Sequence, residues 1–324
     1  MDIELKRLTD KAIAEKAINP DDAVILYNIG KEKPFLLMAY ASEVRDYYKG
    51  RQVSLCSIVN AKSGLCPENC RFCAQSVHHH THAEIYPLIP KDEIIEKAKE
   101  AKACGAHMFS IVTSGTRIEG NSEWNEIEEA IRGMVRLGIK PCASIGMLDE
   151  ERAQRLKEAG LFRYHHNLET ARSNFDAICS THDYEDDIET VKNAKKAGLS
   201  VCSGGIIGLG ETMEQRIEMA FTLKELDVDS VPINILNPIE GTPLADMQPL
   251  TPVEILITIA LYRFILPDKD IKLCGGKEKN LRQLLPLGIV AGCNSLMTGN
   301  YLTTLGRDAA SDIEMIKDLG FTVT

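Results

Sequence analysis

Three cysteines near residue 70 form the feature of this sequence with the most specific chemistry. Cys66, Cys70 and Cys73 are spaced as CxxxCxxC within the segment CPENCRFC. Zinc ribbons use two CxxC pairs and bacterial ferredoxins use CxxCxxC, and neither pattern is present here. Three thiolates can hold three irons of a cubane and leave the fourth iron open. The spacing therefore indicates a [4Fe–4S] cluster whose open iron can chelate S-adenosylmethionine (SAM) through its amino and carboxylate groups.

Four other segments accompany this loop in a fixed order. They read YHHNLET (164–170), VCSGGIIGLGET (201–212), SVPINILNPIEGTPLAD (230–246) and AGCNSLMTG (291–299). Together with CPENCRFCAQS (66–76), they make the chain resemble the biotin synthases of the radical SAM superfamily over roughly residues 45–305. The resemblance implies the conversion of dethiobiotin to biotin. In that reaction a 5′-deoxyadenosyl radical abstracts hydrogen, and a second, auxiliary iron–sulfur cluster gives up a sulfide.

The resemblance also implies which residues bind the two small molecules. For SAM they are Phe72, Ser114, Glu169, Gly204 and Ile206, and for the substrate they are His165, Asn167, Asn234, Thr303 and Thr304. His165, Asn167 and Glu169 alternate along one expected strand, so we expect them to share a face. An asparagine amide suits the ureido ring of dethiobiotin because it offers both a donor and an acceptor.

The auxiliary cluster is where the chain departs from the family. The resemblance implies a [2Fe–2S] cluster held by three cysteines and one arginine, and Cys142 and Cys202 match two of those positions. The other two positions hold Ser110 and Lys272. A lysine must lose its proton before it can bind iron, and it does not replace arginine conservatively at such a site. A [2Fe–2S] site of the usual design therefore cannot form.

Other cysteines are available on the expected interior strands. Cys274 lies two residues from Lys272 and so shares its face, and Cys56 lies on the first strand. Our hypothesis is a four-iron auxiliary cluster held by Cys142, Cys202 and Cys274, with Cys56 as a candidate fourth ligand. The remaining thiols, at Cys104, Cys179 and Cys293, are interpreted as small packing side chains.

Strands and helices alternate along the part of the chain that carries these residues. Strands are expected at 53–59, 108–113, 141–145, 164–168, 200–207, 230–235, 271–274 and 293–298, and helices at 92–103, 123–137, 150–159, 185–197, 214–226, 252–265 and 278–285. Eight strands alternating with helices, without a linker rich in Pro, Gly or Ser, favour one closed (β/α)8 TIM-type barrel. An open doubly wound sheet is the alternative.

The expected domain organisation follows from the same pattern. Residues 1–50 are charged and helical and predict an N-terminal helical cap, residues 51–300 form the barrel, and residues 301–324 complete the substrate site. A loop with His78, His79, His80 and His82 follows the cysteine loop and is expected to be exposed to solvent.

Charge and composition limit the partners. The chain has 37 Lys and Arg against 47 Asp and Glu, a net charge of −10, which argues against nucleic acid and anionic membranes. The start lacks the pattern of a signal peptide, so we expect a cytoplasmic protein, where ten cysteines indicate metal or redox chemistry. The resemblance adds a homodimer and an electron donor such as flavodoxin or ferredoxin.

Two alternative functions stay open at this point. Another radical SAM barrel enzyme, such as a hydrogenase maturase or a methylornithine-forming mutase, would share the cysteine loop. A non-catalytic iron–sulfur carrier would need exposed, transferable clusters, whereas the cysteines of the expected auxiliary site lie on interior strands. Formation of 5′-deoxyadenosine from SAM separates an enzyme from a carrier.

Overall fold

Parallel strands close into a barrel in the computed structural model, which describes residues 2–304 and 306–324. The first strand, β1 (Gln52–Lys62), pairs with β2 (Met108–Thr113) on one side and with β9 (Ser295–Met297) on the other. Between them follow β3 (Lys140–Ser144), β4 (Arg163–His165), β5 (Ser200–Cys202), β6 (Gly205–Ile207), β7 (Ser230–Ile235) and β8 (Asp270–Leu273). Both β5 and β6 pair with β7, so they share the fifth of eight positions. The predicted TIM-type barrel is confirmed, and the open sheet was the wrong alternative.

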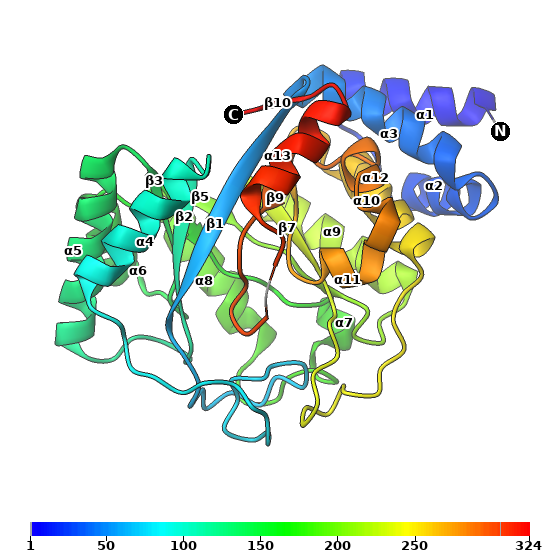
Figure 1. Ribbon diagram of the computed structural model, residues 1–324. Coiled ribbons are helices and arrows are strands. Elements are labelled where there is room, and N and C mark those ends of the chain that lie inside the picture. Colours follow the sequence, from blue (N-terminus) through cyan, green and yellow to red (C-terminus); the bar gives the residue numbers. More distant parts are fainter. Residues whose placement is uncertain (1, 305) are drawn as a thin grey trace.

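Helices surround the barrel (Figure 1). The outer layer consists of α4 (Lys91–Ala103), α5 (Asn121–Leu137), α6 (Glu150–Ala159), α8 (Tyr184–Lys196), α9 (Met213–Glu225) and α10 (Pro252–Ile265), and short turns of helix follow at α7 (Arg172–Phe175), α11 (Lys277–Leu281), η1 (Arg282–Leu284) and α12 (Leu287–Val290). Local sequence sets these boundaries. Asp149 caps α6 by accepting a hydrogen bond from the Arg152 N–H, and Gly160 ends that helix in the left-handed conformation.

The first part of the chain forms three helices, α1 (Asp2–Glu15), α2 (Pro20–Glu32) and α3 (Pro34–Lys49). They pack against α9, α10 and α12 on the outside of the barrel. In Figure 1 they lie at the upper right, while the loops that follow the strands gather at the lower end. These helices therefore cover the outer helices of the barrel and leave the carboxyl ends of the strands open.

Two predicted strands are shorter or more broken than expected. β4 ends at His165, so Asn167 and Glu169 follow the strand instead of continuing it, and Glu169 adopts a positive φ of 60°. The predicted strand 200–207 is interrupted at Ser203 and Gly204. A Cβ atom on Gly204 would stand 2.2 Å from the Pro232 carbonyl oxygen, so only glycine permits this approach to β7. The predicted helix 278–285 is likewise split into α11 and η1.

The end of the chain contains two elements that the sequence patterns did not predict. Helix α13 (Ala309–Asp318) begins at Asp308, whose side chain accepts a hydrogen bond from the Ser311 N–H. Strand β10 (Thr322–Val323) then pairs with the start of β1. Most of the segment predicted to complete the substrate site therefore lies at the opposite end of the barrel from the loops (Figure 1).

Candidate active site

A cavity of about 290 Å³ opens at the carboxyl ends of the barrel strands, where TIM-barrel enzymes hold their substrates. Most of the residues predicted to bind small molecules line it together: Phe72, His165, Asn167, Ile206, Asn234, Thr303 and Thr304. Cys73 of the cysteine loop also lines this cavity. Segments far apart in the sequence thus meet around one space.

The cysteine loop is folded back on itself by backbone hydrogen bonds. The Cys66 N–H donates to the Gln75 carbonyl at 3.0 Å, and the Cys73 N–H donates to the Cys70 carbonyl at 2.9 Å. The buried Gln75 side chain accepts from the Ser63 hydroxyl at 3.0 Å, which ties the loop to the end of β1. These contacts fix the backbone positions of the cysteines.

The electrostatics of the three thiols fit a metal-cluster site. Burial raises the pKa of Cys66, and it raises the pKa of Cys73 to about 11. A hydrogen bond to Cys179, together with burial, raises the pKa of Cys70. The free thiols therefore stay protonated at neutral pH, and iron must displace their protons when it binds. All three residues are partly exposed, so iron can reach them.

The polar residues after β4 form a small network beside this loop. The Asn167 amide donates to Glu169 at 3.4 Å, and burial raises the pKa of Glu169 to about 8. A neutral carboxyl can both donate to and accept from the hydroxyls of a ribose. Burial and the charges of Lys272 and Arg163 hold the pKa of His165 well below its usual value, so this imidazole is neutral.

Asn234 is held in place by the backbone on both sides. Its Oδ1 accepts from the Gly275 N–H at 3.1 Å, and its Nδ2 donates to the Gly205 carbonyl at 3.3 Å. Nδ2 has two N–H groups and Oδ1 can accept two hydrogen bonds, and these contacts use one of each. One N–H donor and one acceptor position of the amide therefore remain for a ligand.

Ser114 and Gly204, two of the residues predicted to bind SAM, do not line the cavity. The Ser114 hydroxyl donates to the Gly64 carbonyl at 2.7 Å, next to the cysteine loop. Gly204 faces Pro232 of the neighbouring strand. A SAM-binding role for either residue stays a prediction.

Four buried thiols lie one layer below the cavity, towards the amino ends of the strands. Cys56, Cys142, Cys202 and Cys274 are all 0% exposed. Cys56, Cys142 and Cys202 lie on β1, β3 and β5, and Cys274 directly follows β8, so the four come from the first, third, fifth and seventh barrel positions, as the alternation of strands predicted. Cavity residues Ile58 and Ser144 come two positions after Cys56 and Cys142 on β1 and β3. Same-face residues on a strand are roughly 6.6 Å apart, so these two thiols lie just beneath the cavity floor. Cys274 directly precedes Gly275, which lines the cavity.

Two buried cations face this thiol layer. Burial alone would lower the pKa of Lys272, but the negative charge of Cys56, Cys202 and Cys274 as thiolates outweighs it and raises that pKa. Arg163 behaves in the same way, and its guanidinium also hydrogen-bonds the Ser200 hydroxyl at 2.9 Å. Positive charge at this depth offsets the negative charge of cluster thiolates.

Several polar atoms in the same layer have no hydrogen-bond partner among the described residues. They are Ser110 Oγ, His165 Nε2, Ser230 Oγ and Lys272 Nζ, and all are buried. Unpaired buried polar atoms are costly, and a group with acceptor atoms at this place would satisfy them. Inorganic sulfides of an iron–sulfur cluster are such acceptors, so the residues present fit a cluster.

The structure adds residues that the sequence patterns missed. Arg163 lies two positions before His165 on the inward face of β4, a periodicity that could have revealed it. Asp187 accepts from His166 Nε2 at 2.7 Å and lies 3.5 Å from His182 Nε2. Burial opposes the charge of Asp187, but the two histidines outweigh it and hold its pKa below the usual value.

Two side chains outside the cavity make contacts that the sequence did not predict. Cys179, interpreted as a packing residue, is buried in the hydrophobic core, and its Sγ also lies 3.7 Å from Cys70 Sγ. The histidine loop is exposed to solvent only in part. His78, His80 and His82 are exposed, but the His79 ring binds the Cys73 carbonyl at 2.8 Å.

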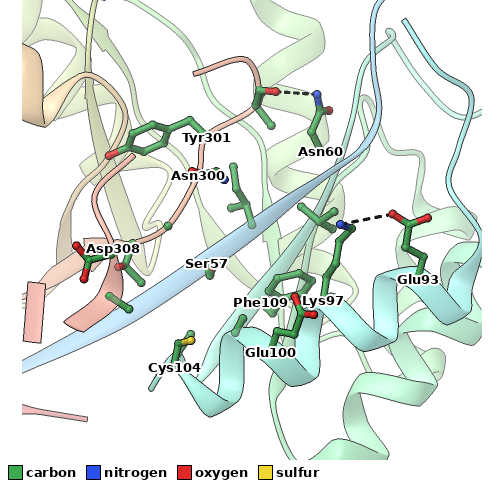
Figure 2. Close-up of a pocket in the computed structure, with 18 of the residues that line it drawn as sticks. Ser57, Asn60, Glu93, Lys97, Glu100, Cys104, Phe109, Asn300, Tyr301 and Asp308 are labelled. Carbon is green, nitrogen blue, oxygen red and sulfur yellow. Dashed lines mark hydrogen bonds and ion pairs between the residues drawn. The ribbon is translucent and has the colours of Figure 1, made fainter. Parts of the chain in front are cut away.

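A larger cavity, of about 740 Å³, lies outside the barrel wall between α4, β1 and the segment before α13. Figure 2 shows its lining, with Glu93 and Lys97 paired on α4 and Asn60 hydrogen-bonded to the Leu302 carbonyl. None of the predicted ligands of either cluster lines this cavity. Its size therefore does not make it the substrate site.

The glycine-rich segment after β6 is anchored by one buried carboxylate. Glu211 accepts from the Gly208 N–H at 2.7 Å and from Arg216 Nε at 2.7 Å, and both charged side chains are almost fully buried. Glu211→Ala removes the more buried of the two carboxylates that pair with Arg216, leaving Glu254 at 2.9 Å, and it leaves the Gly208 N–H without an acceptor. We expect the free energy of unfolding to fall by about 1–3 kcal/mol. Urea denaturation followed by circular dichroism measures this. Glu214→Ala, an exposed site on α9, should change it by about 0.5 kcal/mol or less. Equal stability of the two variants would contradict the anchor.

Comparison with known proteins decides the family. A model of the Radical SAM superfamily matches residues 62–223, and a model of the Biotin and Thiamin Synthesis associated domain matches residues 232–322. The biotin synthase of Geobacter sulfurreducens is 54% identical over 98% of this chain and 96% of its own length. The chain belongs to the biotin synthase family. A family member from Carboxydothermus hydrogenoformans is 49% identical over 98% of both chains.

Solved structures agree on the fold. A methylornithine synthase superposes on this biotin synthase family member with a TM-score of 0.84 at 24% identity, covering 98% of this chain and 97% of its own. The FeFe-hydrogenase maturase of Carboxydothermus hydrogenoformans gives 0.81 at 18% identity, covering 99% and 79%. At such identities the likeness shows the barrel alone. Within the described part of the chain, no helix is long and apolar enough to cross a membrane.

Proposed function

We propose that this chain converts dethiobiotin to biotin by radical SAM sulfur insertion. The observation that carries the proposal is the stacking of two sites in one barrel. A cavity lined by Asn167 and Asn234 lies between the loop of Cys66, Cys70 and Cys73 and the buried thiol layer. The substrate carbons would thus lie between the radical source and the sulfur source. The identity to biotin synthases across nearly the whole chain supports the same conclusion.

At the upper end of the cavity, Cys66, Cys70 and Cys73 would hold the [4Fe–4S] cluster. With SAM bound, this cluster supplies the electron that releases a 5′-deoxyadenosyl radical. Phe72 lies between two of these cysteines and lines the cavity, where its ring can pack against adenine. Glu169 would meet the ribose hydroxyls, and Ser114, Gly204 and Ile206 would complete the SAM site. The walls of the barrel keep water away from the reacting carbons.

In the cavity itself, His165, Asn167 and Asn234 would orient the ureido ring of dethiobiotin. The neutral His165 imidazole and the free positions on Asn234 offer donors and acceptors without adding charge. Thr303 and Thr304 would donate to the carboxylate tail, since both line the far side of the same space.

Below the cavity we propose a four-iron auxiliary cluster, which would provide the sulfide. Cys142, Cys202 and Cys274 are its proposed ligands, with Cys56 as the fourth. A [2Fe–2S] cluster of the usual design needs ligands at Ser110 and Lys272. The negative charge of the surrounding thiolates would stabilise the Lys272 ammonium in its charged form, so it is a poor iron ligand and a good counter-charge.

Other features of the proposal come from the family and the composition. We propose a cytoplasmic homodimer that takes electrons from a flavodoxin or ferredoxin, in keeping with ten unpaired cysteines. We also propose the division into a helical cap (1–50), a barrel (51–300) and a terminal segment (301–324) that reaches the substrate site. Residues 1 and 305 of these ranges lie outside the described residues.

The test is an anaerobic assay of the reconstituted protein with SAM, a reductant and dethiobiotin. We expect both 5′-deoxyadenosine and biotin. Formation of 5′-deoxyadenosine without biotin would favour another radical SAM enzyme, and formation of neither would favour an iron–sulfur carrier.

Substrate affinity gives a finer test. Asn234→Ala removes one partner of buried hydrogen bonds, at a cost of about 1–3 kcal/mol. We expect dethiobiotin to bind about tenfold or more weakly, as measured by calorimetry. Asn125→Ala, at an exposed position on α5, is the matched control and should bind normally. Unchanged affinity in both Asn234→Ala and Asn167→Ala would show that the ring binds elsewhere.

A further inference from the structure

Three ligand-type side chains converge beside the cysteine loop without having a role in the proposed function. Glu68, Cys179 and His182 each offer one ligand atom, and these atoms all lie within 4.8 Å of one another. His182 Nδ1 is 2.8 Å from Glu68 Oε2 and 3.4 Å from Cys179 Sγ. Cys179 is buried, and the other two side chains are each 13% exposed. The cluster is therefore enclosed but not sealed.

The donor set matches one class of ion. A thiolate, an imidazole nitrogen and a carboxylate oxygen are the ligands that Zn²⁺ takes in proteins, with tetrahedral geometry. Calcium and magnesium prefer oxygen atoms alone. Cys70 Sγ lies 3.7 Å from Cys179 Sγ, but the proposed function assigns that thiol to the SAM cluster. Three protein ligands would thus bind the ion and leave one position for water.

The residues behind His182 have the arrangement that metal sites use. The other ring nitrogen, Nε2, lies 3.5 Å from Asp187 Oδ2, and Asp187 in turn accepts from His166 at 2.7 Å. A carboxylate behind a metal-binding histidine fixes the tautomer that leaves Nδ1 free to bind. Two carboxylates, the half-buried Glu68 and the buried Asp187, also gather negative charge that a divalent cation would offset.

We propose that Glu68, Cys179 and His182 bind one divalent metal ion of the zinc type. The site shares no ligand with either iron–sulfur cluster but adjoins the SAM cluster, because Cys179 Sγ lies 3.7 Å from Cys70 Sγ. It goes beyond the proposed sulfur insertion. It joins the cysteine loop to the segment after α7, two parts of the chain already linked by hydrogen bonds from Asn69 to Ser180 at 2.8 Å and from Arg71 to Ile178 at 3.0 Å. The ion clips these segments together and so holds the loop that carries Cys70.

Zinc binding to the holoenzyme tests the proposal. The protein, with both clusters reconstituted anaerobically, is dialysed against a chelator and then titrated with Zn²⁺, and zinc and iron are counted by mass spectrometry. We expect about one tightly held zinc per chain, with X-ray absorption at the zinc edge showing one sulfur at about 2.3 Å and the remaining ligands nitrogen or oxygen. His182→Gln should lose this zinc. Asp187→Asn should weaken its binding by about 10–100-fold.

The histidine loop provides the matched control, because it is the other place where zinc could bind. His80 and His82 are exposed, so a variant with both changed to Gln should keep the tightly held zinc. Iron content should be equal in all the variants, which separates this site from the clusters. Equal zinc in the wild type and His182→Gln, loss of zinc in the His80 and His82 variant, or a zinc environment without sulfur would each overturn the proposal.

Discussion

Replacing Cys66, Cys70 or Cys73 by alanine is expected to abolish reductive cleavage of SAM while the barrel still folds. Each change leaves two protein thiolates for a four-iron cluster, so the cluster is not retained. The cysteines lie in a loop after β1 and not within the barrel wall, which explains why folding should survive. The measurements are 5′-deoxyadenosine formation under reducing conditions and circular dichroism of the purified variants.

The matched control for these variants is Cys104→Ala. Cys104 is exposed at the end of α4 and has no part in either proposed cluster, so this variant should cleave SAM normally. A variant at Cys66, Cys70 or Cys73 that still forms 5′-deoxyadenosine at the normal rate would show that the loop does not hold the SAM cluster.

Cys274→Ala is expected to stop biotin formation and to leave SAM cleavage intact. The reason is that the two sites use different parts of the chain, since Cys274 is fully buried directly after β8 and is not part of the cysteine loop. Cys142→Ala and Cys202→Ala should behave alike, but both residues match ligands of the usual [2Fe–2S] design as well. Cys274 is therefore the residue that distinguishes a four-iron site. Both products are measured in one anaerobic turnover.

Cys293→Ala is the control for loss of a buried thiol. Cys293 is also 0% exposed but packs in the hydrophobic core beneath the helices, and its pKa is raised by burial. It should retain biotin formation. Full biotin formation by Cys274→Ala would contradict the assignment of that thiol to the auxiliary cluster.

Much of the fold was predictable because strand and helix periodicity is local. The strands at 108–113 and 230–235 and the helices at 150–159 and 252–265 have the predicted bounds. The periodicity of apolar residues along a short segment defines such elements without reference to the rest of the chain. The cysteine loop was predictable for the same reason, because the spacing of its three cysteines within eight residues indicates a [4Fe–4S] cluster.

The parts that were missed depend on contacts between distant residues. β10 is only two residues long and exists because it pairs with the start of β1. Glu169 leaves the strand because its backbone turns to positive φ while it still bridges to Gly205. The contact between Cys70 and Cys179 joins residues 109 positions apart, so no local sequence pattern predicts it. Arg163 could have been identified as an inward-facing residue, because it alternates with His165 along the strand. Its role as a counter-charge could be inferred only once the structure placed the cysteines around it.

The central claim is that the sulfur source is a four-iron cluster in the barrel interior. Mössbauer spectroscopy and iron counting on the variant with Cys66, Cys70 and Cys73 all changed to alanine isolate that cluster from the SAM cluster. We expect about four irons per chain with the spectrum of a cubane-type cluster. About two irons per chain with a [2Fe–2S] spectrum would contradict the account.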